Sequence, residues 1–187
     1  MKKMLTLAAI LCCAMTATVF TACGSDDDNS SEPAKDPAST AVMNCTLYTN
    51  DAALESFDYY VKYYDANGKE VSEKITWSEN LDNLKRRTWT KNLVAKLPAK
   101  VGVYMEVRAK DGVDLEVAHK MAYGYAVSFA SLTASGQTIR EFRPASRYDD
   151  MTIKKGMVQE FLSNENPLFN QGYEFDAEGK VVTDKLW

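Results

Sequence analysis

The feature that most constrains the fold of this chain is the alternation of apolar and polar residues in short runs that end at turn signals. Residues 101–109 place an apolar side chain at every second position. In an extended strand such positions share one face, so this run predicts a strand with one buried side. Asp111-Gly112 follows as a turn signal, and residues 113–117 alternate again. The pattern predicts a β-hairpin.

Residues 55–77 predict a second hairpin. A tyrosine-rich run ends at Tyr64, the turn Asp65-Ala66-Asn67-Gly68-Lys69 follows, and a return run leads to Trp77. A similar turn occurs at Asp176-Ala177-Glu178-Gly179-Lys180. Glycine tolerates the left-handed backbone that closes a type I turn, so both segments predict the same tight turn.

Together these runs predict an all-β or mostly β domain. Further strands are expected at 121–132 and 138–142. Two short helices are expected as well, one capped by Ser78 and one over residues 154–163. About seven to nine strands, with a turn about every 10 residues, are typical of antiparallel β-sandwiches. We therefore expect a sandwich of the immunoglobulin or transthyretin sort with one or two short helices.

The N-terminal residues predict an export signal. Met1-Lys2-Lys3 is basic, and no charged residue follows from Met4 to Ser25. The segment Val19-Phe20-Thr21-Ala22-Cys23 resembles the lipobox of bacterial lipoproteins, although that pattern usually has Leu in place of Phe20. A membrane-spanning helix is the alternative, but the small residue ahead of Cys23 favours cleavage. The resemblance implies a signal peptide over 1–22 and acyl chains, palmitate among them, on Cys23.

The residues behind Cys23 carry a second resemblance. Ser25, Asp26, Asp27 and Asp28 are similar to the Ser-Asp-Asp-Asp export signal of Bacteroides-type surface lipoproteins. That resemblance implies an outer-membrane protein, anchored by lipid and facing the cell exterior. An acidic, solvated spacer is the alternative interpretation of the same residues.

Residues 23–40 predict an acidic, flexible tether, and residues 41–187 predict a single domain. The tether holds five acidic residues and one basic residue among Ser, Pro and Ala. Its net charge is therefore -4, out of the -6 that remains once Lys2 and Lys3 leave with the signal, so residues 41–187 are nearly neutral. Because no basic surface remains to attract nucleic acid, we expect a membrane contact through the lipid anchor and no nucleic-acid partner.

Catalytic and metal-binding patterns are missing from the sequence. Cys12 and Cys13 leave with the signal, and Cys45 is predicted to be a buried thiol on a strand, so no disulfide is expected. His119 is the only histidine, and no Gly-X-Ser-X-Gly elbow accompanies it. Tyr148-Asp149-Asp150 is expected in an exposed loop. We expect no enzymatic activity, no catalytic residue, no cofactor and no metal site.

The aromatic residues of 57–64 are the best candidates for a binding site. Alternation places Asp58, Tyr60, Lys62 and Tyr64 on the face opposite Phe57, Tyr59, Val61 and Tyr63. Exposed rings on a sheet stack on sugars in carbohydrate-binding modules and anchor protein interfaces. The alternative is that these tyrosines merely cover a neighbouring loop. Trp77 and Trp89 are expected in the core, and Trp187 is expected to pack against a sheet edge.

The sequence thus favours a non-enzymatic surface lipoprotein that binds an extracellular glycan or protein. The alternative is a structural or accessory subunit of an outer-membrane complex or surface fibre, which would use an unpaired sheet edge for a partner strand.

Overall fold

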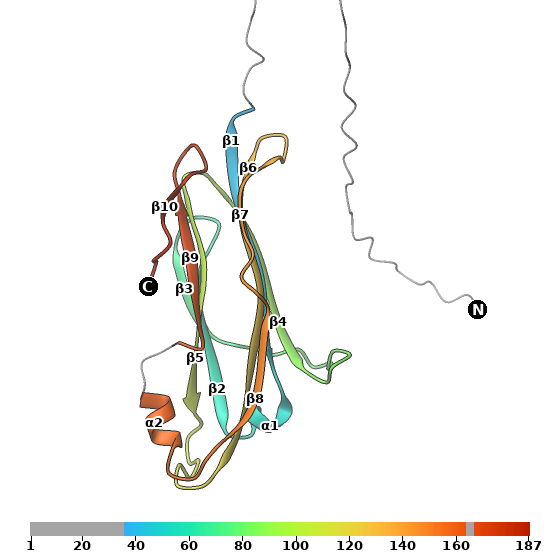
Figure 1. The fold of residues 1–187 in the computed structure, drawn as a ribbon, viewed down its shortest axis with the longest axis vertical. Helices are drawn as coiled ribbons and strands as arrows, with labels where there is room; N and C mark the ends of the chain where they lie inside the picture. The colour runs from blue at the N-terminus through green and yellow to red at the C-terminus, as the bar shows by residue number, and fades with distance from the viewer. Residues whose placement is uncertain (1–35, 164–166) are drawn as a thin grey trace, which may run out of the picture. The chain divides into compact units, whose positions relative to one another are not determined.

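The computed structural model describes residues 36–163 and 167–187 and confirms a mostly β fold of two antiparallel sheets packed face to face (Figure 1). Sheet A contains β1 (Ala38–Thr49), β4 (Arg87–Lys96), β6 (His119–Thr133), β7 (Thr138–Phe142) and β8 (Arg147–Ile153). Sheet B contains β2 (Phe57–Tyr64), β3 (Glu70–Lys74), β5 (Ala99–Ala109), β9 (Phe169–Phe175) and β10 (Val181–Thr183). The two short helices of the described residues are α1 (Asp51–Leu54) and α2 (Val158–Ser163).

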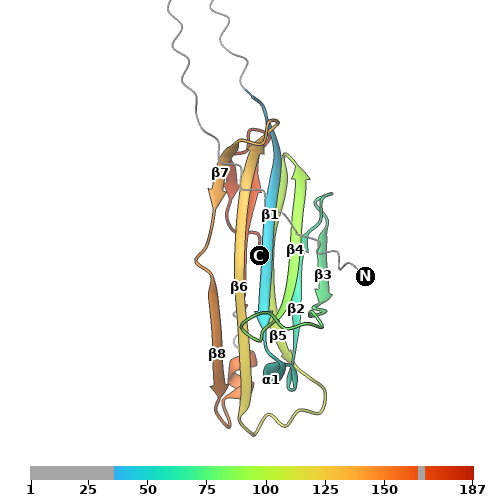
Figure 2. The same ribbon diagram turned by 90° about the vertical axis from the view of Figure 1, so that its right-hand side faces the viewer.

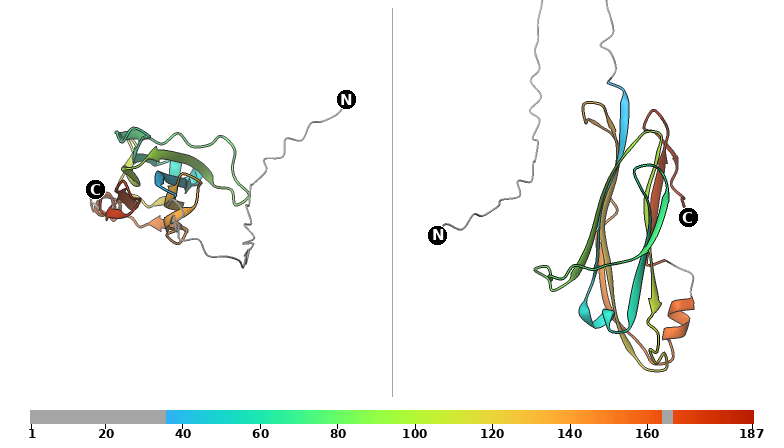
Figure 3. Two further views of the ribbon diagram at one scale, coloured as in Figure 1. Left: turned by 90° about the horizontal axis from the view of Figure 1, so that it is seen from above. Right: turned by 180° about the vertical axis from the view of Figure 1, so that it is seen from behind.

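The strand order of each sheet places long strands at its centre. Sheet A runs β4-β1-β6-β7, and β8 pairs with the first half of β6, as Figure 2 shows from the side of this sheet. Sheet B runs β10-β9-β5-β2-β3. The view from above in Figure 3 shows the two layers end-on. Because β1 and β5 each have a partner on both sides, both are protected at the centre of the sandwich.

Alternation along the strands builds one core between the sheets. Burying one large apolar side chain in such a core contributes roughly 1.5–3 kcal/mol to the free energy of unfolding. The largest fully buried side chains come from both layers and include Met43, Leu47, Phe57, Tyr59, Val61, Val101, Val103, Met105, Met121, Phe129 and Phe175. Cys45 lies among them on β1, as predicted. Trp77 and Trp89 are only partly buried and pack at the margin of this core.

The two predicted glycine turns are present and share one hydrogen-bond pattern. In the β2–β3 hairpin, the backbone N–H of Gly68 donates to the carbonyl of Asp65, whose own N–H donates to the carbonyl of Lys69. The Asp65 carboxylate also accepts from the backbone of Asn67 and Lys69. Gly68 has a φ of 77°, the left-handed conformation that glycine adopts without steric cost. The Asp176–Lys180 turn repeats these bonds, so both predictions are confirmed.

The hairpin predicted across Asp111-Gly112 is wrong. β5 pairs with β2 and β9 in sheet B, whereas β6 pairs with β1, β7 and β8 in sheet A. β2 occupies one edge of β5 as far as Ala109, and α2 packs beside the other edge beyond Met105, where the pairing with β9 ends, so residues 113–117 do not pair with β5. Residues 110–118 instead form a loop that crosses from one sheet to the other.

Three smaller predictions need correction. Residues 78–86 form a loop rather than a helix, and the Ser78 hydroxyl accepts from the backbone of Thr88 across its base. The second helix, α2, begins only at Val158, because Gly156 has a φ of 76° and closes a separate turn before it. Tyr148-Asp149-Asp150 lies on β8 and not in a loop.

The folded domain begins earlier than the sequence suggested. β1 begins at Ala38, so residues 38–40, which we assigned to the tether, belong to sheet A. The Asp36 carboxylate also accepts a hydrogen bond from the backbone N–H of Ser135. The signal peptide, Cys23 and the export-signal residues Ser25, Asp26, Asp27 and Asp28 lie outside the described residues. Among the residues that are described, none of the helices has the length and apolar character needed to cross a membrane.

Candidate functional site

Strand β2 places the four predicted site residues on the outer face of sheet B. Phe57, Tyr59, Val61 and Tyr63 are buried, and Asp58, Tyr60, Lys62 and Tyr64 alternate with them on the other side. These outward side chains are half-buried rather than fully exposed. Each of them is in contact with a neighbour, and those neighbours decide what the face can bind.

Tyr64 is covered by the C-terminal residue of the chain. The rings of Tyr64 and Trp187 stack with centroids 5.3 Å apart and planes inclined by 24°. The indole Nε1–H donates to the Glu70 carboxylate at 2.9 Å. Burial, together with the nearby Glu70, raises the pKa of Tyr64. Trp187 therefore lies over the face of sheet B and not at an edge as expected, and the C-terminus lies on that side in Figure 1.

A pair of glycines makes room for this C-terminal segment. Gly102 of β5 lies opposite Gly172 of β9. A Cβ atom on Gly102 would lie 2.9 Å from the Trp187 ring, and one on Gly172 would lie 2.7 Å from Leu186. Side chains at these two positions would therefore displace Leu186 and Trp187 from the sheet.

The other predicted residues are also engaged. The Arg108 guanidinium lies over the Tyr60 ring at 4.2 Å, and the Asp58 carboxylate pairs with Lys74 at 2.6 Å. Lys62 lies over the Tyr104 ring at 4.8 Å. The structure thus brings Tyr60 and Tyr64 onto one face but does not leave them as a bare platform for a sugar ring.

A cavity of about 720 Å³ opens beside this face, between β5 and α2. The pairing of β5 with β9 ends at Met105 and Phe169. The later part of β5 therefore has no strand on that side, and α2 packs there instead (Figure 1). We call this space the β5–α2 cavity; it is lined by Tyr104, Glu106, Val107, Arg108, Tyr123, Arg147, Phe161, Leu162, Pro167 and Leu168.

The charges of the β5–α2 cavity are arranged in pairs. Arg108 pairs with Glu106 at 2.5 Å, and Arg147 pairs with Asp149. Hydrogen bonding to these carboxylates raises the pKa of both arginines. Burial, and then the hydrogen bond with Asp149, raises the pKa of Tyr123. The cavity therefore offers fixed hydrogen-bond donors and acceptors without a strong net charge.

The reactive side chains lie elsewhere. Burial raises the pKa of the Cys45 thiol to about 12, which leaves it unreactive in the core. His119 accepts or donates at Nδ1 with the Ser56 hydroxyl at 2.7 Å and contacts the Asp114 carbonyl through Nε2 at 2.7 Å. These bonds link the 110–118 loop, through His119, to Ser56 just before β2. The described residues contain no cluster of three His, Cys, Asp or Glu side chains placed to hold a metal ion.

Comparisons with known proteins assign no family to this chain: no family pattern, curated protein or solved structure matches it.

Most residues of the β5–α2 cavity were missed by the sequence reasoning. Tyr104, Glu106 and Arg108 lie on the polar face of a strand that was predicted correctly, so the alternation of β5 contained a usable signal. Tyr123 and Arg147 come from sheet A. Their approach to β5 depends on how the two sheets pack, which no local pattern specifies.

Proposed function

We propose that this chain is a non-enzymatic lipoprotein, anchored through Cys23 and displayed on the outer face of the outer membrane, that binds an extracellular glycan in the β5–α2 cavity. The lipobox resemblance and the Ser25-Asp26-Asp27-Asp28 segment support the location. The composition and size of the cavity support the ligand class.

The observation that carries the glycan assignment is the combination of rings and paired charges around one cavity. Tyrosine rings pack against the apolar faces of sugars, while carboxylates and guanidiniums form strong hydrogen bonds with hydroxyl groups. Because Arg108 and Arg147 already face carboxylates, an uncharged sugar fits better than an anion. A volume of about 720 Å³ also lies within the usual range of small-molecule sites.

A glycan array probed with soluble residues 36–187 tests this assignment. We expect a reproducible hit whose affinity falls about tenfold or more in Tyr104→Ala or Arg147→Ala, because each removes a direct contact. Thr90→Ala, on the outer face of sheet A, is the matched control and should bind normally. Loss of binding only in the double variant Tyr60→Ala/Tyr64→Ala would place the ligand on the β2 face instead.

Membrane fractionation tests the anchor separately. Cys23→Ser removes the thiol that would receive the acyl chains, so the protein should leave the membrane fraction for the soluble one. Protease treatment of intact cells should digest the wild-type domain if it faces the exterior. Retention of the Cys23→Ser protein in membranes would refute the lipobox interpretation.

A structural role in an envelope complex or surface fibre is the second candidate, and the free edge of sheet A favours it. Within the described residues β4 is ten residues long and pairs only with β1. The open side of such a strand can accept a strand from a partner. Arg87, Lys91 and Lys96 on β4 are the kind of charges that limit indiscriminate pairing. A blank array from a folded domain, with co-purification of envelope proteins, would favour this role.

A further inference from the structure

The loop between β3 and β4 projects from the domain and exposes two leucines. We call residues 78–86 the leucine loop; it is drawn in green and extends sideways in Figure 1 and in the right panel of Figure 3. Leu81 is 43% exposed and Leu84 is 70% exposed. Two large apolar side chains exposed on one projecting loop are suited to anchor an interface with another molecule.

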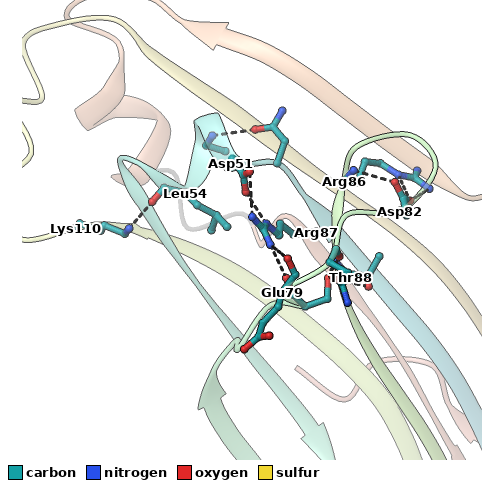
Figure 4. Close-up of polar contacts among 12 residues, drawn as sticks. Asp51, Leu54, Glu79, Asp82, Arg86, Arg87, Thr88 and Lys110 are labelled. Atoms are coloured by element: carbon teal, nitrogen blue, oxygen red, sulfur yellow. Dashed lines mark hydrogen bonds and ion pairs between the residues drawn. The ribbon is translucent and has the colours of Figure 1, made fainter.

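The tip of the leucine loop is a fixed turn. The Asp82 carboxylate accepts hydrogen bonds from the backbone N–H groups of Leu84 and Arg86, each at 2.9 Å. The backbone of Lys85 donates to the Asp82 carbonyl, and the backbone of Asp82 donates to the Arg86 carbonyl. Arg86 also pairs with the Asp82 carboxylate at 2.7 Å, as Figure 4 shows.

The base of the leucine loop is fixed as well. The Arg86 guanidinium lies over the Tyr48 ring at 3.9 Å. Arg87 binds both oxygens of Asp51, at 2.6 and 3.1 Å, and donates to the carbonyl groups of Ser78 and Glu79 (Figure 4). Since polar contacts hold the loop at both levels, the backbone at Leu84 has little conformational entropy left to lose on binding.

The Asp82 turn repeats the bonding of the Asp65 and Asp176 turns but differs from both at its tip. Where those turns have Gly68 and Gly179 in the left-handed conformation, this one has Lys85 at a φ of 59°. Where they have Asn67 and Glu178, this one has Leu84. Both differences are unfavourable in the free protein, because a side chain is strained at positive φ and leucine is apolar.

We propose that the leucine loop is a docking element that inserts Leu84 into an apolar socket of a partner protein, with a carboxylate of that partner facing Lys85. Asp82 and Arg86 neutralise each other, as do Asp51 and Arg87. Lys85 makes no ion pair within the described part of the chain. The tip therefore combines one apolar side chain with one available positive charge.

The position of the loop favours a partner protein over the anchoring membrane. Arg87, at the base of the loop, pairs with Thr49 at the far end of β1 from Ala38. About 35 Å of extended strand separates the two ends of β1. A lipid anchor ahead of residue 36 would thus hold the opposite end of β1.

Photocrosslinking in the full-length chain, in the cells that produce it, tests the proposal. A photoreactive amino acid replaces Asn83, next to Leu84, and in the control it replaces Ala66, the equivalent position of the Asp65 turn. We expect a discrete protein adduct from position 83 and none from position 66. Adding Leu84→Asn should lower the yield about tenfold, since it removes the inserted side chain. An unchanged melting temperature would show that this variant folds.

The captured protein, identified and purified, is then titrated with the full-length chain. Its affinity should fall about tenfold for Leu84→Asn and also fall for Lys85→Glu, while Val182→Asn, at another exposed site, binds normally. The absence of an adduct, an adduct insensitive to Leu84→Asn, or crosslinks only to lipid or to a second copy would each overturn the proposal.

Discussion

The Asp65 turn and the Asp82 turn have the same backbone hydrogen bonds but different residues at their tips, Asn67-Gly68 in one and Leu84-Lys85 in the other. In both, the aspartate carboxylate accepts two backbone N–H groups, and the chain closes between the first and fifth residues. The fourth residue is Gly68 in one turn and Lys85 in the other, and both have positive φ. The comparison teaches that the aspartate determines this turn through its hydrogen bonds, while glycine only lowers the backbone strain at the fourth position.

Among the changes that test this comparison, replacing Gly68 at the fourth position of the Asp65 turn should have the largest effect on the free energy of unfolding. Gly68→Lys places a side chain at a φ of 77° in open space, so backbone strain is its main cost. We expect the free energy of unfolding to fall by roughly 1–2 kcal/mol, measured by urea denaturation. Gly68→Asn is the control, because asparagine tolerates this conformation better. A loss equal to that of Gly68→Lys would contradict the explanation.

The reverse exchange should stabilise the protein. Lys85→Gly relieves the strain at a φ of 59°, although glycine also loses more freedom on folding. The net gain in the free energy of unfolding should be about 0.5–1 kcal/mol, visible as a higher urea midpoint. If stability falls instead, contacts of the Lys85 side chain, and not backbone strain, dominate at this position.

Leu84→Asn should leave stability nearly unchanged. Because this side chain is 70% exposed, the free energy of unfolding should stay within about 0.5 kcal/mol of the wild-type value. Thermal unfolding followed by circular dichroism measures the effect, and Leu47→Asn in the core is the contrasting variant that should unfold the domain. A large loss in Leu84→Asn would mean that the leucine supports its own loop.

The smallest effect on global stability should be the pH response of the Asp82 turn. The hydrogen bond from Arg86 holds the pKa of Asp82 below its usual range. The ionised Asp82 carboxylate therefore stabilises the turn fully above the ordinary aspartate pKa of about 3.9. This stabilisation is lost as the pH falls through the lower pKa of the folded state. An NMR titration of the side-chain carboxyl groups should show Asp82 titrating at a lower pH than an ordinary aspartate. In Arg86→Gln the Asp82 midpoint should rise toward the ordinary value.

The hairpin that contains the Asp65 turn illustrates what the sequence can predict. Its strands are adjacent in the chain, its turn chemistry is local, and its buried face follows from alternation, so β2 and β3 were predicted together. The hairpin predicted across Asp111-Gly112 is wrong because the alternation of residues 113–117 contains no information about which edges of the preceding strand are free. One edge pairs with β2 as far as Ala109, and α2 packs beside the other edge beyond Met105, an arrangement that depends on the whole domain.

The leucine loop and the outer face of β2 show the same limit of prediction from sequence. Leu81 and Leu84 have helical spacing, and this suggested a helix after Ser78. The hydrogen bonds of Asp82 to its own backbone favour a turn instead. The face of Asp58, Tyr60, Lys62 and Tyr64 followed from alternation, but its cover by Trp187 did not. That contact joins the chain end to β2 across Gly102 and Gly172 and depends on tertiary packing alone.

The pairing of β1 with β4 has a mechanical consequence. A pulling force between residue 36 and the leucine loop would enter β1 near Ala38 and leave β4 near Arg87. These antiparallel strands pair from Thr40–Lys96 to Thr49–Arg87, so the force would run along the ladder. The backbone hydrogen bonds between them would bear the load together, in shear, instead of opening one after another from an end. A domain held at residue 36 and pulled at the leucine loop would thus resist the force with the whole β1–β4 ladder at once.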